Sequence, residues 1–261
     1  MKPVPLPTVS IVTPSFNQAR YLEATIQSVL SQDYPRIEYI IVDGGSTDGS
    51  VEIIKKYSSQ LAWWVSEKDR GQTDAINKGF ARAGGGIFAW LNSDDTYEPR
   101  SVGHAVKYFL DHPDVGMLYA DCNYINESGK VIGRFPAAQT SLSLLRRGYV
   151  HIPQQTTFFR ADLWKQVGPL DPSFYFAMDY DLWTRIAARA EMKYLQGEVF
   201  ANFRIHTSGK TIAADDRCWP EMLRVHYRDG GSALAPIVAK YYIRKLLAPF
   251  WAWRFKRRLG V

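Results

Sequence analysis

The sequence predicts an α/β protein whose central sheet is doubly wound, mixed and mostly parallel. Two observations lead to this fold class. Short β-branched or apolar runs alternate with amphipathic segments of helical period through the first half of the chain. The links between them are short, as in the repeated strand–helix units that build parallel sheets. With 261 residues and 46% hydrophobic content, the chain is long enough to bury such a core.

The elements of the first half follow in a regular order. The run VSIVT over residues 9–13 is β-branched and ends at a Pro14–Ser15 turn signal, which predicts a strand. Behind it, Leu22, Ile26 and Val29 recur at helical spacing, so a helix is expected there. The next elements are predicted as a strand over 37–42, a helix from Val51, a strand over 61–65, a helix over 73–83, a strand over 87–91 and a helix over 99–112.

The second half is less regular but mixes the same element types. Residues 116–135 are expected to form a strand and a hairpin that turns at 127–129. A helix is predicted over 179–190. Residues 199–206 alternate, which places Arg204 and His206 on one side of a strand.

The net charge of +6 comes from the C-terminal end of the chain. Residues 236–261 hold seven of the 32 lysines and arginines and none of the acids, so residues 1–235 are close to neutral. This distribution argues against a nucleic-acid-binding protein. We therefore expect one main domain over 1–235 and a basic, aromatic and amphipathic tail over 236–261.

The composition of the tail suits two different roles. Val238, Tyr242 and Leu246 can form one helical stripe until Pro249 interrupts it. Aromatic and basic side chains together are typical of segments that bind an anionic membrane interface, which is the role we favour. A helix that packs on the main domain or contacts another subunit would have the same composition. Because no uncharged apolar run is long enough to span a bilayer, we expect a cytoplasmic protein, attached peripherally to the inner membrane face through this tail.

Polar residues follow three of the predicted strands, at the edge where the carboxyl ends of parallel strands meet. They are the segments 13–15, 43–46 and 92–95. Turn chemistry accounts for any one of them, since Asp, Gly, Ser and Asn are common in turns and N-caps, but three at one edge favour a binding site. The chain has neither a GxGxxG fingerprint after the first strand nor a GxxxxGK[ST] loop, so the phosphates of a nucleotide would need another source of positive charge.

Asp94 and Asp95 place two carboxylates side by side at the end of an apolar strand. Such groups persist together if they are solvated, separately hydrogen-bonded or bridged by a cation. A divalent ion held by one or two carboxylates and a diphosphate would reduce the repulsion between the carboxylates and also neutralise the phosphates of a nucleotide. We therefore expect Mn²⁺ or Mg²⁺ as the cofactor.

Five motifs, in order and covering roughly residues 8–210, resemble the family 2 glycosyltransferases. These are inverting, nucleotide-sugar-dependent enzymes of GT-A fold. Any one motif alone would be weak evidence, but their order and spacing are specific. The motifs are SIVTPSFNQARYLEATIQSVLSQDYPRIEYIIVDGGSTDGS, DRGQTDAINKGF, GIFAWLNSDDTYEP, FAMDYDLWTR and FRIHTSGKT.

The resemblance implies a role for each matching residue. The first loop borders the base and ribose of the nucleotide, and Asp43 hydrogen-bonds the base, typically uracil. Asp179 is the catalytic base, and Asp94, Asp95 and His206 are the metal contacts, with Asn92, Asp94 and Asp95 in the DxD element. The implied nucleotide-sugar contacts are Pro14, Ser15, Phe16, Asp43, Asp74, Asn77, Asn92 and Asp94.

Three departures from the family pattern affect these roles. Asn92 replaces the first Asp of DxD, so Asp94 and Asp95 would hold the cation nearly alone. Gly44 replaces the second Asp of the usual VDDGS. Met178 replaces the Glu of a Glu-Asp pair and leaves one carboxylate there.

The expected function is inverting transfer of a sugar, with UDP as the typical carrier, to a hydroxyl of a glycan or lipid-linked acceptor. Asp179 would take the acceptor proton, and the metal would stabilise the departing diphosphate. Two alternatives stay open: a sugar-phosphate nucleotidyltransferase, and a non-catalytic nucleotide-sugar- or carbohydrate-binding module. The sequence TPSFNQARYL lacks the Gly-rich basic loop of nucleotidyltransferases. Asp179 also has a purely structural explanation as a first-turn acid of its helix.

Overall fold

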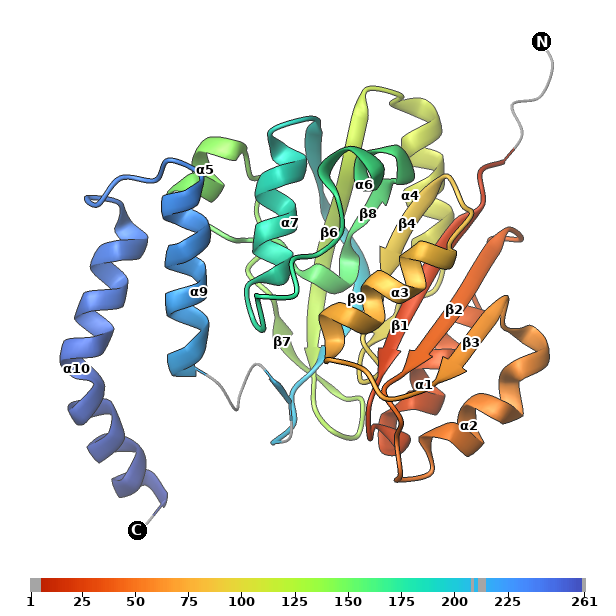
Figure 1. Cartoon of the computed structure of the whole chain (residues 1–261), viewed down its shortest axis with the longest axis horizontal. Helices are drawn as coiled ribbons and strands as arrows, with labels where there is room; N and C mark the ends of the chain where they lie inside the picture. Colours follow the sequence, from red (N-terminus) through yellow and green to blue (C-terminus); the bar gives the residue numbers. More distant parts are fainter. Residues whose placement is uncertain (1–5, 208, 211–214, 260–261) are drawn as a thin grey trace.

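The structure, a computed structural model, describes residues 6–207, 209–210 and 215–259, without the side chains of 215–217 and 248–259. The first five residues of the predicted main domain and the last two of the tail therefore lie outside the described residues. The predicted α/β class is confirmed, because helices cover both faces of one mixed sheet (Figure 1). The strands are β1 (Val9–Ser15), β2 (Ile37–Asp43), β3 (Trp63–Ser66), β4 (Ile87–Trp90), β5 (Thr96–Tyr97), β6 (Val115–Ile125), β7 (Val131–Arg134), β8 (Phe158–Arg160) and β9 (Glu191–Arg204).

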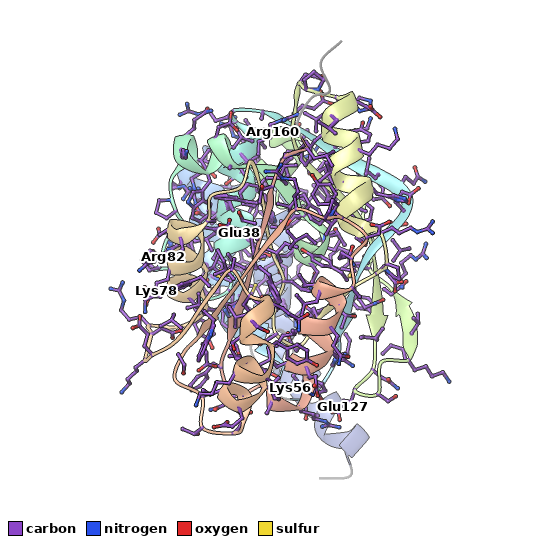
Figure 2. The ribbon with its side chains drawn as sticks, turned by 90° about the vertical axis from the view of Figure 1, so that its right-hand side faces the viewer. Glu38, Lys56, Lys78, Arg82, Glu127 and Arg160 are labelled. Carbon is purple, nitrogen blue, oxygen red and sulfur yellow. The ribbon has the colours of Figure 1, made fainter. Side chains whose placement is uncertain are left out.

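Within the described residues, the nine strands run in the order β3-β2-β1-β4-β8-β6-β9-β5, and β7 pairs with β6. The pairs β1·β2, β2·β3, β1·β4 and β6·β9 are parallel, while β8 is antiparallel to both β4 and β6. The carboxyl ends of β1, β2, β3, β4, β6 and β9 therefore share one edge. Figure 2 labels a residue near each end of the parallel strands. Arg160 pairs with Ile87 at the start of β4, and Glu127 lies in the turn after β6, near the carboxyl edge.

Two hydrophobic layers hold the helices on the sheet. Alternate strand residues point to opposite faces, so Ile11 packs with α1 and α4 while Val12 packs with α3. Gly79 lets α3 lie close to β1, because a Cβ there would be 2.4 Å from Val12 Cγ1. The helices are α1 (Ala19–Leu30), α2 (Ser50–Tyr57), α3 (Gln72–Arg82), α4 (Ser101–Asp111), α5 (Leu142–Arg146), α6 (Ala161–Val167), α7 (Met178–Ala187), α9 (Asp215–Arg228) and α10 (Pro236–Leu259).

The C-terminal part differs most from the prediction. The strand expected over 199–206 is the end of a longer strand, β9, whose first half is largely polar and gives no clear apolar period. Helix α9 was not predicted, since Pro220 lies inside it. The expected interruption at Pro249 is wrong, because α10 runs through that residue. A proline removes a single helix hydrogen bond, which a helix at the edge of the molecule can tolerate.

Among the described side chains, the buried apolar contacts of helix α10 with the body lie at its beginning. Ala235, Ile237 and Val238 are buried against Trp219 and its neighbours on α9. The rest of α10 runs beside α9, on the side of α9 that is farther from the sheet (Figure 1). In the part of the chain that the structure describes, no helix combines the length and apolar character needed to cross a membrane.

Candidate functional site

A cavity of about 930 Å³ opens at the carboxyl edge of the sheet. Its walls come from the loops after β1, β2, β3 and β4, from the start of α7, from the end of β9 and from residues 209–210. The volume is within the range of about 300–1,000 Å³ that is usual for small-molecule sites. Of the predicted catalytic, nucleotide-sugar and metal contacts, those that line it are Pro14, Ser15, Phe16, Asn92, Asp94 and Asp179. The others, Asp43, Asp74, Asn77, Asp95 and His206, do not.

Asp94 lies in this cavity beside a buried histidine. Its Oδ2 is 3.0 Å from Nε2 of His206, whose side chain is 1% exposed against 18% for Asp94. The Tyr21 ring packs on the imidazole, with 4.8 Å between ring centroids. A carboxylate oxygen next to an imidazole nitrogen is a donor set that manganese accepts, and magnesium accepts the oxygen.

The protein alone would give a cation only part of its coordination shell. Among the described residues, no group of three or more His, Cys, Asp or Glu side chains is arranged to hold a metal. His206 Nδ1 is buried and, within the same residues, has no hydrogen-bond partner. The residues present thus fit an ion that Asp94 and His206 hold together with oxygens of a bound diphosphate and water, which is common for Mg²⁺ in nucleotide sites.

Asp95 is fully buried and does not line the cavity. Its Oδ1 accepts the backbone N–H of Arg204 at 2.9 Å, and its Oδ2 is 3.4 Å from the Asn92 amide nitrogen. Burial, and then the neighbouring Asp94 charge, raise the pKa of Asp95 well above its ordinary value. Because N–H groups of the protein face both oxygens of Asp95, the structure does not support its predicted role as a direct metal ligand. Asp95 instead fastens the loop after β4 to β9.

Asp43, predicted to bind the base, is used by its own loop. It is fully buried, and its carboxylate accepts hydrogen bonds from the backbone and hydroxyl of Ser46 and from the Ser66 hydroxyl. The carboxylate that lines this end of the cavity is Asp69, after β3. A Cβ on Gly44 would lie 2.8 Å from Asp69 Oδ2, so the glycine makes room for this acid. Asp69 lies in a motif quoted above, but the pattern did not single it out.

Asp74 and Asn77, predicted to line the donor site, lie on α3 outside the cavity lining. Burial alone would raise the pKa of Asp74, but the Arg70 backbone and guanidinium and the Lys78 ammonium lower it. Asn77 bridges both backbone groups of Leu170, at 2.9 and 3.0 Å. Both residues therefore stabilise the fold, while Gln72 is a polar α3 residue that lines the cavity.

Asp179 lies in the first turn of α7 and lines the cavity. Its Oδ1 accepts the Tyr180 backbone N–H at 2.7 Å. Burial raises its pKa, against the lowering effects of this hydrogen bond and of the Lys210 charge. A carboxylate with a raised pKa, facing a cavity, is suited to take a proton near neutral pH.

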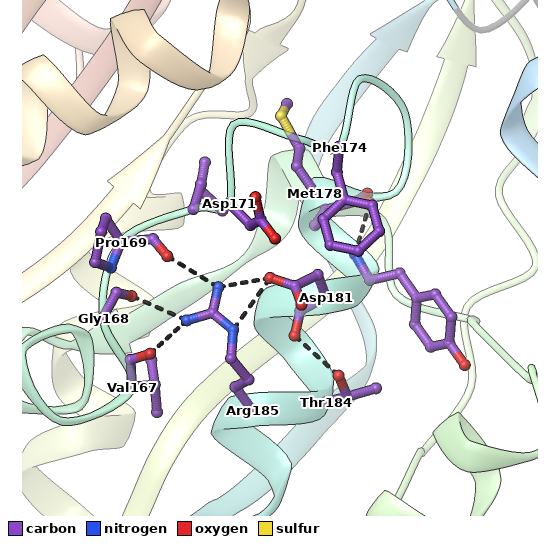
Figure 3. A network of polar contacts seen from close by, with 12 residues as sticks. Val167, Gly168, Pro169, Asp171, Phe174, Met178, Asp181, Thr184 and Arg185 are labelled. Atoms are coloured by element: carbon purple, nitrogen blue, oxygen red, sulfur yellow. Dashed lines mark hydrogen bonds and ion pairs between the residues drawn. The ribbon is translucent and has the colours of Figure 1, made fainter. Parts of the chain in front are cut away.

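Asp181, two residues further on, has a structural role. It is fully buried and forms ion pairs with Arg185 of the same helix, at 2.7 Å, and with Arg228 of α9. Arg185 also donates to the carbonyls of residues 167–169, which ties the preceding loop to α7 (Figure 3). Glu221 of α9 accepts three backbone N–H groups, from residues 175, 176 and 177, just before α7. Helix α9 therefore holds the start of α7, a contact that sequence reasoning missed together with the helix itself.

The fold matches that of solved glycosyltransferases of GT-A type. TarS of S. aureus, solved in complex with UDP-GlcNAc, matches with a TM-score of 0.71 and 17% identity over 90% of this chain and 71% of that one. The mannosyltransferase PcManGT of Pyrobaculum calidifontis, solved with GDP-Man and Mn²⁺, matches with a TM-score of 0.65 and 21% identity over 91% of this chain and 70% of that one.

The chain belongs to glycosyl transferase family 2, whose family model matches residues 10–181. An uncharacterised glycosyltransferase of Rickettsia typhi is 31% identical over 216 residues, covering 80% of this chain and 67% of that protein. One of Mycobacterium tuberculosis is 35% identical over 188 residues, covering 71% of each chain. The family predicted from the ordered motifs is confirmed.

Proposed function

We propose that this chain is an inverting, metal-dependent hexosyltransferase that moves a sugar from a nucleotide diphosphate sugar, of the UDP class, to a hydroxyl of a glycan or lipid-linked acceptor. One observation carries the proposal: Asp94, with His206 beside it, and Asp179 border the same cavity at the carboxyl edge of the sheet. A cation-binding carboxylate and a basic carboxylate in one cavity are the two groups that this transfer needs.

The Asp179 carboxylate takes the proton of the acceptor hydroxyl. As it does so, the acceptor oxygen bonds to the anomeric carbon and the bond to the diphosphate oxygen breaks on the opposite sugar face, which inverts the configuration. Its raised pKa makes this carboxylate a stronger base than an exposed one. The aromatic residues Tyr175 and Phe176 border the cavity beside it and would face the acceptor.

Asp94 and His206 would hold a Mn²⁺ or Mg²⁺ ion, which when bound neutralises charge on the departing diphosphate. Asn92 lines the cavity without adding a charge, and its Oδ1 accepts a hydrogen bond from Gln72 at 2.7 Å. Pro14, Ser15 and the 61%-exposed Phe16 border the far end, where the base and ribose would lie.

A donor screen tests this function. The full chain is incubated with UDP- and GDP-linked sugars in Mn²⁺, Mg²⁺ or EDTA, and released nucleoside diphosphate is measured. We expect slow hydrolysis of one donor class with metal and none with EDTA. Binding without turnover, across donors and glycan or lipid-linked acceptors, would instead support the non-catalytic module.

We further propose that residues 236–261 form an appendage that attaches to an anionic membrane surface of the cytoplasmic leaflet. Beyond its docked first turn, α10 exposes Tyr242, Ile243, Leu246 and Leu247 among basic residues, and the segment contains no acid. Co-sedimentation of the full chain with vesicles containing phosphatidylserine measures this attachment. A Tyr242→Ser/Leu246→Ser variant should bind less, while Leu110→Ser, at an exposed leucine of α4, should bind as the parent does. Equal binding by all three would reject the membrane role.

A further inference from the structure

Lys210 is a cation of the cavity to which no role has yet been given. It lies four residues after His206, between β9 and α9, and lines the cavity together with Asp179. Its Nζ donates to Gln72 Oε1 at 2.8 Å. The same Nζ is 4.1 Å from the centroid of the Tyr175 ring, so the ammonium is held in place on two sides.

The other two cations of the cavity lining are placed for different tasks. The Arg204 guanidinium already donates hydrogen bonds to the backbone, from Nε to the Asp94 carbonyl at 2.8 Å and from Nη1 to the Asn126 carbonyl at 3.0 Å. Lys68 is exposed and lies beside Gly45, at the end of the cavity formed by the loops after β2 and β3. Lys210 is therefore the cation beside the proposed base.

Lys210 is half-buried, and the residues that the structure describes give it no direct counter-ion. Within residues 6–207, 209–210 and 218–247, no carboxylate lies within ion-pairing distance of its Nζ, and its hydrogen-bond acceptor there is a neutral amide. Burial lowers the pKa of Lys210 to about 8, although the charges of Asp179, Glu221 and Cys218 raise it. A partly buried ammonium gains more from an incoming anion than a fully exposed one does.

Hydrogen bonds connect this ammonium to the loop that carries the proposed metal ligand. Lys210 donates to Gln72, and Gln72 Nε2 donates in turn to Asn92 Oδ1 at 2.7 Å. Asn92 is two residues before Asp94. Two hydrogen bonds therefore link the Lys210 ammonium to the loop of Asp94, and both side chains line the same cavity.

We propose that Lys210 is a further catalytic residue, which binds the donor diphosphate and stabilises the negative charge that builds on it as the sugar leaves. The assignment rests on the proposed function. The electron pair of the breaking glycosidic bond goes to the diphosphate oxygen, and the acceptor proton goes to Asp179. Lys210 keeps its proton throughout, because its task is electrostatic.

Binding of UDP and GDP, and of uridine and guanosine, tests the assignment in Mn²⁺ buffer by calorimetry on the full chain. We expect Lys210→Met to weaken binding of the preferred nucleoside diphosphate by about tenfold or more, as for the loss of one charge-assisted contact, and to leave nucleoside binding unchanged. Lys210→Arg should retain most of the affinity. Lys107→Met, on the exposed face of α4, should behave as the parent does.

The possible failures can be told apart. If Lys210→Met binds the diphosphate as tightly as the parent protein, or loses diphosphate and nucleoside affinity equally, the Lys210 assignment is overturned and the proposed function stands. If the parent protein binds no nucleoside diphosphate at all, both fall. Thermal midpoints of each variant separate a local loss of affinity from misfolding.

Discussion

The loop after β4 and the start of α7 each carry two close acids, and the two regions use them in parallel ways. In each, one acid borders the cavity, Asp94 or Asp179, and the other is fully buried, Asp95 or Asp181. The buried acids differ in their partners. Asp95 is hydrogen-bonded by a backbone N–H and by amides, whereas Asp181 pairs with two guanidinium groups. Asp95 and Asp181 are equally buried, so the difference between them comes from the charge of the groups that they contact.

The largest expected effect is a loss of turnover on substitution of the α7 acid that borders the cavity. Asp179→Asn should lower kcat by about 10²- to 10⁴-fold, the usual contribution of a general base, and leave the fold intact. Steady-state turnover of the donor found in the screen measures it. Asp162→Asn, at an exposed first-turn acid of α6, is the matched control and should keep full activity. Near-native turnover by Asp179→Asn would show that the residue is only a helix-terminal acid.

The pH dependence of the rate sharpens this assignment. A base works when deprotonated, and burial raises the pKa of Asp179 above its ordinary value of 3.8. We therefore expect kcat/KM to fall as the pH drops through a pKa higher than that of an exposed carboxylate. A rate that stays constant down to pH 4 would contradict a buried base.

The next effect, on stability, separates Asp181 from Asp95. Asp181→Asn removes the buried charge that two guanidinium groups share and should lower the free energy of unfolding by about 3 kcal/mol, the low end for a broken buried ion pair. Asp95→Asn removes a charge that has no cationic partner, so its cost should be smaller. Urea denaturation of both variants measures the difference. Equal losses would mean that the partners do not matter.

The smallest effect concerns pH and Asp95. Because its pKa is raised in the folded state, the folded protein binds more protons than the unfolded chain between about pH 4 and that pKa, so stability falls as pH rises through this window. The free energy of unfolding of Asp95→Asn should not show this decrease, so the variant should become more stable relative to the parent protein as the pH increases. Urea titrations from pH 4 to 8 in metal-free buffer compare them. Parallel curves would show that Asp95 is ionised at little cost.

The sequence was enough to predict the sheet edge and the separate segments that meet there. Pro14, Asn92 and Asp94 line the cavity because parallel strands end at one edge, and strand ends can be recognised from apolar runs. An apolar run does not show whether a carboxylate at the strand end points into the cavity or into its own loop. Asp43 follows β2 as expected, yet it turns into its own loop because Ser46 and Ser66 donate to it.

The contributions of α9 and of Lys210 were beyond sequence reasoning for a different reason. Glu221 reaches the start of α7 only because α9 packs there. Helix α9 could not be predicted, because a proline such as Pro220 inside a segment argues against a helix. Lys210 lies within the quoted motif FRIHTSGKT, but the motif does not reveal that its ammonium lies over Tyr175. Both contacts depend on tertiary packing between segments far apart in the chain.

Manganese binding tests the central claim, that Asp94 and not Asp95 holds the catalytic cation. Mn²⁺ is titrated by electron paramagnetic resonance into the parent protein, Asp94→Asn and Asp95→Asn, each with saturating UDP or GDP. We expect at least about a tenfold loss of Mn²⁺ affinity for Asp94→Asn, equivalent to about 1.4 kcal/mol, and a change within about twofold for Asp95→Asn. A loss confined to Asp95→Asn, or no loss in either variant, would contradict it.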